Sequence, residues 1–248
     1  MQAALTQLRQ QHQEAEAFAA LAGLSILQLR NNNSLRLGIK WKHSLTLAHW
    51  RTLGTLIGCG SLPMLENLQI EGDECGSEGV ALLAAGLHRG GLPSLLMLCL
   101  SSSQIGDQAA SALASALTIR AVPALDSFHF YENRMGDVGT PALIPALRQL
   151  PLTTLCVCGN DHIDDQFLAA LIAQPMTGVP LLESLQVLDL CQSHITDAGC
   201  AALASALLSG ALPALTQVDL REVFDEEWSP AHIEVFEARI SLGPVVIL

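Results

Sequence analysis

Leucine and other apolar residues recur along the chain in the six-residue pattern L-x-x-L-x-L, in which apolar and variable positions alternate. Alternation of this kind predicts a strand with one buried face. A less regular copy, LSILQL, begins at Leu24 and is expected to form the first strand. The six regular copies, which begin 27 to 33 residues apart, are LENLQI, LLMLCL, LDSFHF, LTTLCV, LQVLDL and LTQVDL, starting at Leu65, Leu95, Leu125, Leu152, Leu185 and Leu215.

A helix is predicted after each strand, beyond a polar break. Apolar residues there lie four apart, which places both members of a pair on one helix face. The pairs are Leu83/Leu87, Leu113/Leu117, Leu143/Leu147 and Leu203/Leu207. The segments before them, such as IGDQAA and ITDAGC, carry an aspartate that we expect to cap its own helix. We expect these aspartates to be structural and not to act as catalytic acids or bases. They are Asp107, Asp137, Asp165 and Asp197.

The repeated unit of strand, turn, helix and return resembles the ribonuclease-inhibitor-like subfamily of leucine-rich repeats. The resemblance covers residues 60–222 well and residues 20–60 loosely. It implies an α/β solenoid of about seven units, curved and right-handed, with a parallel sheet on the concave face and helices on the convex face. One unit cannot bury its leucines alone, so stacked units share a continuous core.

Three segments follow from this pattern. Residues 1–60 are expected to form an N-terminal cap helix and an irregular first repeat, residues 61–222 the regular repeats, and residues 223–248 a C-terminal cap. An extra residue in LTTLCVCGNDH and the early Pro175 predict an irregularity near residues 174–184. The two ends differ in charge, because residues 17–65 hold no acid and the tail is acidic. Either both ends are solvated caps, or the basic end docks an acidic protein surface or RNA.

Composition narrows the function classes. A net charge of −12 disfavours a general nucleic-acid binder, because phosphates would be repelled. No secretory signal and no membrane-spanning apolar stretch are recognised. Seven cysteines without a CxxC pair favour a reducing, cytoplasmic location, with association to an organelle or the cytoskeleton left open.

Catalytic motifs are missing from the sequence: there is no Gly-rich phosphate loop, no HExxH and no GxSxG. We therefore expect no enzyme activity and no cofactor. Outward side chains of the predicted sheet should form two rows along neighbouring strands. The first row is Gln28, Gln69, Cys99, His129, Cys156, Asp189 and Asp219, and the second is Arg30, Glu71, Ser101, Tyr131, Cys158, Cys191 and Arg221.

Five members of these rows, Cys99, His129, Cys156, Cys158 and Cys191, should fall close together. Thiolate and imidazole groups could hold zinc, but a flat sheet splays its side chains in parallel, which suits a tetrahedral ion poorly. Small cysteines that tile the sheet are the simpler interpretation, and we assign no metal site.

The concave face is the candidate binding surface, because aromatic and charged side chains there are typical of protein contacts. The chain is interpreted as a non-enzymatic protein–protein interaction scaffold, with a fixed subunit of a larger assembly as one form of that role. The alternative is a regulator of a small GTPase resembling Ran GTPase-activating proteins; a ribonuclease inhibitor is disfavoured because seven units could not wrap such a target. The candidate contact residues are Gln69, Glu71, His129, Tyr131, Glu132, Asp189, Asp219 and Arg221.

Overall fold

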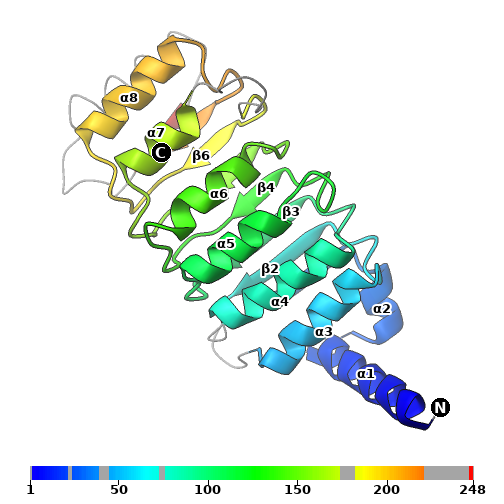
Figure 1. Cartoon of the computed structure of the whole chain (residues 1–248). Helices are drawn as coiled ribbons and strands as arrows, with labels where there is room; N and C mark the ends of the chain where they lie inside the picture. The colour runs from blue at the N-terminus through cyan, green and yellow to red at the C-terminus, as the bar shows by residue number, and fades with distance from the viewer. Residues whose placement is uncertain are drawn as a thin grey trace.

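The computed structural model describes residues 2–21, 24–38, 45–72, 76–173, 182–220 and 246–247. Parallel strands form one eight-stranded sheet in which they lie in chain order, and the helices stack in a layer beside it (Figure 1). The strands are β1 Ser34–Gly38, β2 Asn67–Glu71, β3 Met97–Ser101, β4 Ser127–His129, β5 Thr154–Cys156, β6 Val187–Asp189, β7 Gln217–Asp219 and β8 Val246–Ile247. The helices are α1 Gln2–Leu21, α2 Ile26–Asn31, α3 Leu47–Gly58, α4 Gly76–Arg89, α5 Asp107–Ala116, α6 Gly139–Leu147, α7 Asp165–Ile172 and α8 Asp197–Leu208.

This architecture is a leucine-rich-repeat solenoid, as the sequence predicts. The central leucine of each L-x-x-L-x-L copy lies against the same position of the next strand, as Leu68 lies beside Leu98. Both side chains are buried between the sheet and the helices, with at most 1% exposure. The helix leucines expected to face inward, such as Leu83 and Leu203, are fully buried as well. The core is therefore one continuous apolar layer that runs the length of the sheet.

Two asparagines at the polar break join successive turns from within. The buried Asn160 amide donates to the carbonyl oxygens of Phe130 and Val157 over 2.8 Å, and its own carbonyl accepts from the N–H of Asn133. The Asn133 amide in turn donates to the carbonyl of Leu100. An asparagine has both a donor and an acceptor, so it satisfies buried backbone groups of two repeats at once.

A residue with positive φ follows each of five strands. Its φ lies between 50° and 69° in every case, a left-handed conformation that turns the chain out of the sheet. Glycine adopts this conformation without strain, whereas other residues are disfavoured there by about 1–2 kcal/mol. The five residues are Gly72, Ser102, Glu132, Gly159 and Gln192.

The prediction that LSILQL forms the first strand is wrong. From Ile26 onward this segment belongs to the short helix α2. Ser25 and Gln28 form a capping box, in which Gln28 Oε1 accepts from the Ser25 N–H and Ser25 Oγ accepts from the Gln28 N–H. Such reciprocal bonds favour a helix start over an extended strand. The first strand is instead β1, whose Ser34 pairs with Asn67 of β2. Gln28 and Arg30 therefore do not lie on the sheet.

The N-terminal helix α1 was expected to cap the first repeat, and only its C-terminal end packs against the core. Phe18 is fully buried, whereas Leu5 and Leu8 are 50% and 61% exposed. The remainder of α1 extends away from the stack (Figure 1). At the other end β8 continues the sheet by pairing in parallel with β7, in the segment expected to be a C-terminal cap.

Two predictions concern residues outside the described part of the chain. The irregularity predicted near residues 174–184 lies there except for its last three residues, and Arg221 lies there as well. The proposed segment boundaries remain predictions. Among the described helices, none combines the length and the apolar character needed to cross a membrane.

Candidate functional site

The sheet presents one face to the helices and one face away from them. We call the latter the outer sheet face; it is the surface expected to be concave. The register of the strands confirms the first predicted row, because Cys99, His129, Cys156 and Asp189 are direct neighbours on successive strands. Gln69 and Asp219 extend the same row at its two ends. The sequence therefore predicts the neighbours within this row correctly.

Tyr131 lies over smaller side chains of this face. Its hydroxyl hydrogen-bonds with Ser101 and interacts with Cys99 and Glu71. Ser101 and Cys99 are buried, at 0% and 4% exposure, although both belong to the predicted outward rows. Burial raises the pKa of Tyr131 to about 12, so the hydroxyl remains neutral and available as a donor near neutral pH.

Carboxylates lie around this tyrosine. Glu71 is half-buried on β2, and Glu132 is exposed in the turn after β4, where it accepts from Ser102 Oγ over 2.7 Å. Burial lowers the pKa of His129, so its imidazole is neutral at pH 7 and adds no positive charge. Within the described residues, the outer face of β3 to β7 carries neither lysine nor arginine. The surface around Tyr131 is therefore acidic.

The expected cysteine cluster divides into two parts. Cys99 lies near Glu71, with 3.8 Å between its Sγ and Glu71 Oε1. Cys156 lies instead with Cys158, and its thiol donates to Asp189 Oδ2 over 3.1 Å. The hydrogen bond with Cys156 and burial raise the pKa of the Cys158 thiol, and burial raises that of Cys191. Both thiols are therefore protonated at pH 7 in the free protein.

Asp219 differs from an ordinary contact residue, because it is only 4% exposed. It lies beside Asp189 in the strand register, at the β7 end of the first row. Sequence spacing gives the side of a strand to which a residue points, but not what lies over it. The prediction that Asp219 lies on an accessible contact surface is therefore not supported in this structure.

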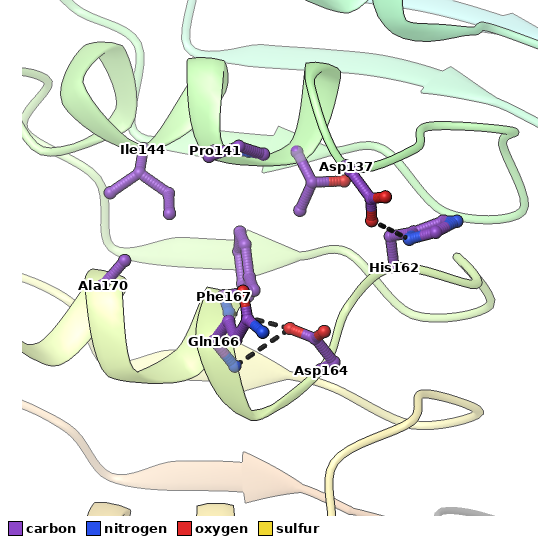
Figure 2. Close-up of a pocket in the computed structure, with 9 residues that line it drawn as sticks. Asp137, Pro141, Ile144, His162, Asp164, Gln166, Phe167 and Ala170 are labelled. Carbon is purple, nitrogen blue, oxygen red and sulfur yellow. Dashed lines mark hydrogen bonds and ion pairs between the residues drawn. The ribbon is translucent and has the colours of Figure 1, made fainter.

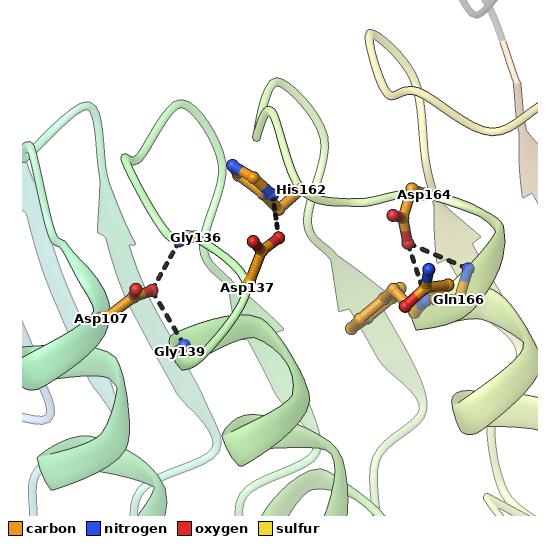
Figure 3. Close-up of polar contacts among 8 residues, drawn as sticks. Asp107, Gly136, Asp137, Gly139, His162, Asp164 and Gln166 are labelled. Atoms are coloured by element: carbon orange, nitrogen blue, oxygen red, sulfur yellow. Dashed lines mark hydrogen bonds and ion pairs between the residues drawn. The ribbon is translucent and has the colours of Figure 1, made fainter.

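Most of the aspartates expected to cap their own helices instead bind groups of the next repeat. Asp107 Oδ1 accepts from the N–H groups of Gly136 and Gly139, which begin the next repeat (Figure 3). Asp165 likewise accepts from the N–H and hydroxyl of Thr196 in the repeat that follows. The helix cap at α7 is provided by Asp164, one residue earlier. The prediction was wrong because it considered only donors within one repeat.

Asp137 occupies the position equivalent to Asp107 but meets a side chain. Its Oδ1 lies 2.8 Å from His162 Nδ1, in the repeat with the extra residue (Figure 3). Both side chains are accessible, at 90% for Asp137 and 43% for His162. The pair therefore bridges the starts of α6 and α7 at the surface.

Beside this pair a groove of about 530 Å³ runs between α6 and α7 (Figure 2). Ile144 and Pro141 line it from α6, and Phe167 and Ala170 from α7. At the other end of the helices, Arg148 donates to the carbonyl oxygens of Ala170 and Ala173. This groove is not predicted by the repeat pattern; its signals in the sequence are the two prolines of α6, Pro141 and Pro145, and the repeat of unusual length.

Comparison with known proteins gives a likeness of fold. No protein-family model matches the chain, and no curated protein matches its sequence. A crystal structure of a Bacteroides fragilis protein is similar with a TM-score of 0.53 and 12% identity, over 89% of this chain and 66% of that protein. Internalin C2 from Listeria monocytogenes gives a TM-score of 0.49 and 16% identity, over 94% of this chain and 91% of that chain. A second Listeria monocytogenes internalin gives a TM-score of 0.41 and 16% identity, over 94% of this chain and 62% of that chain.

At 12% identity, the likeness to the Bacteroides fragilis protein concerns the fold alone. The solenoid itself is established by the order and register of its strands. Membership of the ribonuclease-inhibitor-like subfamily remains a prediction.

Proposed function

We propose that the chain is a non-enzymatic interaction scaffold that binds a protein with a basic surface through its outer sheet face. The observation that carries this proposal is the acidic surface around Tyr131, with no lysine or arginine on the described outer face of β3 to β7. Opposite charges across an interface steer association and exclude wrong partners. The chain's net charge of −12 acts in the same direction.

The proposed contact surface centres on three side chains. Tyr131 provides the aromatic group, held by its hydrogen bond with Ser101, and tyrosine is among the residues that most often dominate binding energy. Glu71 and Glu132 provide negative charge close to it, because Glu71 interacts with its hydroxyl and Glu132 is the next residue of the chain. The two carboxylates belong to β2 and to the turn after β4, and the strand between them is β3.

A stable partner is one form of this role, in which the chain is a fixed subunit of a larger assembly. We infer a cytoplasmic location for the chain, because a reducing compartment keeps cysteines free. Among the described residues the free cysteines are Cys59, Cys99, Cys156, Cys158, Cys191 and Cys200. The alternative proposal is a regulator of a small GTPase.

Affinity capture from the native cell extract at moderate salt, followed by mass spectrometry, tests the proposal. We expect a protein partner in stoichiometric amount that is released as the salt concentration rises, because surface charges are screened. A small GTPase in the eluate whose GTP turnover increases with added chain would support the alternative. A chain that elutes alone at low salt would contradict both.

A further inference from the structure

Three thiols and a carboxylate meet on the outer sheet face where β5 and β6 end. The Sγ atom of Cys156 lies 3.6 Å from Cys158 Sγ and 3.1 Å from Asp189 Oδ2. The ligand atoms of these three residues all lie within 4.8 Å of one another. The Cys191 thiol lies next to this group: it interacts with Cys158 and Asp189, and its ligand atom is within 4.8 Å of those of Asp189 and Asp219.

The local backbone explains why side chains that a flat sheet would splay come together here. Alternate residues of a regular strand are about 6.6 Å apart, yet the two sulfurs are separated by only 3.6 Å. Strand β5 ends at Cys156, and the chain turns at Gly159 with φ of +64°. Cys158 therefore lies in the turn rather than in the strand, and its side chain can approach that of Cys156.

The carboxylate is fixed in the same way. Asp189 ends β6, and its Oδ1 accepts from the N–H of Cys191 over 3.1 Å. The other carboxylate oxygen, Oδ2, is thereby directed toward Cys156. A ligand whose orientation is fixed by a second hydrogen bond loses less freedom when it binds a metal ion.

These separations fit a tetrahedral zinc ion. With Zn–S bonds of about 2.3 Å, two thiolates at the tetrahedral angle lie about 3.8 Å apart. A thiolate and a carboxylate oxygen bound to the same ion lie about 3.6 Å apart. The observed separations of 3.6 Å and 3.1 Å differ from these values by about half an ångström or less, which side-chain rotation can supply.

The charges of the region favour a cation. No lysine or arginine lies on the outer face of β3 to β7 in the part of the chain that the structure describes. The acidic Asp219 lies next to Asp189 on the following strand, and its carboxylate is within 4.8 Å of the ligand atoms of Asp189 and Cys191. A divalent cation bound here would offset the negative charge of these two neighbouring carboxylates.

We propose that Cys156, Cys158, Cys191 and Asp189 bind one zinc ion. Binding forms three Zn–S bonds and one Zn–O bond, and the three thiol protons pass to solvent. Four protein ligands fill a tetrahedral shell, so the site is structural and joins the β5 and β6 repeats. The proposal does not depend on a protein partner.

Cobalt substitution of the full chain tests the site, because tetrahedral Co²⁺ with thiolate ligands absorbs strongly in the visible and near ultraviolet. We expect the wild type to bind one Co²⁺ per chain with these bands, and stoichiometric Zn²⁺ to remove them. Cys156→Ser and Cys158→Ser should each reduce the thiolate-to-cobalt absorption, because each removes one of the three proposed metal–sulfur bonds. Cys59→Ser is the matched control, since Cys59 is an exposed cysteine at the end of α3, and its bands should be unchanged.

A measurement on the wild type alone covers the case in which a variant fails to fold. Zn²⁺ should protect Cys156, Cys158 and Cys191 from alkylation, as read by peptide mass spectrometry, and should leave Cys59 reactive. Cobalt bound without thiolate absorption, or zinc that protects none of the three cysteines, would overturn the proposal.

Discussion

The carboxylate of Asp107 in α5 binds the backbone N–H of Gly139, the first residue of α6, with 2.8 Å between Oδ1 and N. A side chain at Gly139 would collide with it, because a Cβ atom there would lie 2.7 Å from the same Oδ1. Aspartate and glycine therefore act together, one in each of two successive repeats. The sequence I-G-D-x-x-A resembles a helix cap but connects neighbouring units.

Removing this connection should weaken the stack. We expect Asp107→Ala to lower the free energy of unfolding by about 1–3 kcal/mol, because two N–H groups lose a charged acceptor. Asp137→Ala is the control: its side chain is 90% exposed and its pair with His162 lies at the surface, where about 0–1 kcal/mol is expected. Chemical denaturation measures both, and equal losses would contradict the assignment.

Asn160 should be among the most sensitive positions of the solenoid. Asn160→Ala leaves the buried carbonyls of Phe130 and Val157 and the Asn133 N–H without this partner. We expect a loss of about 3 kcal/mol in unfolding free energy. Asn31→Ala, at the exposed end of α2, should change stability by less than about 0.5 kcal/mol in the same denaturation experiment. An equally small loss of unfolding free energy for Asn160→Ala would show that the hydrogen bonds of Asn160 contribute little to stability.

Two glycines in left-handed turns can be compared directly, because their surroundings differ. Gly60 and Gly159 both have positive φ, but a Cβ at Gly60 meets nothing within 4 Å, whereas at Gly159 it would lie 3.1 Å from Glu132 Cγ. Gly60→Ala should lose about 1 kcal/mol from backbone strain alone, and Gly159→Ala should lose more. Thermal unfolding orders the two variants, and the reverse order would be inconsistent with the described contact.

Tyr131 is the only tyrosine of the chain, so its titration can be followed directly by ultraviolet absorbance. Burial raises its pKa to about 12 in the folded protein, against about 10 in an unfolded chain. The neutral hydroxyl stabilises the fold fully below pH 10, and this contribution is lost as the pH rises toward 12. A folded-state midpoint near 10 would mean that the Tyr131 hydroxyl is not buried as described.

Much of the fold follows from the sequence because burial at alternate positions requires it. The repeated leucines set the strand register, which in turn places Cys99, His129 and Cys156 side by side. The pattern fails at LSILQL, where the bonds between Ser25 and Gln28 select a helix. The spacing of apolar residues alone does not predict such local hydrogen bonds.

The candidate site is less accessible to sequence reasoning, because it depends on contacts between residues about thirty positions apart. Tyr131 covers Ser101, and Asp189 approaches Cys156; neither contact has a signal in one repeat taken alone. The groove between α6 and α7 is lined by residues of both helices, so it exists only where two successive repeats meet. These features require the relative position of neighbouring units.

In the proposed function, a basic protein binds the acidic outer sheet face around Tyr131. The most direct test compares the affinity of the captured partner for wild type and for the double variant Glu71→Lys/Glu132→Lys, with Glu78→Lys as the control. Glu78 is exposed on α4, in the helix layer, so its reversal changes the net charge without altering the outer face.

We predict that the double variant, shown to be folded by circular dichroism, binds the partner at least about tenfold more weakly, whereas Glu78→Lys binds nearly as wild type. Equal affinities for the wild type and the folded double variant would show that the partner does not bind through this acidic surface.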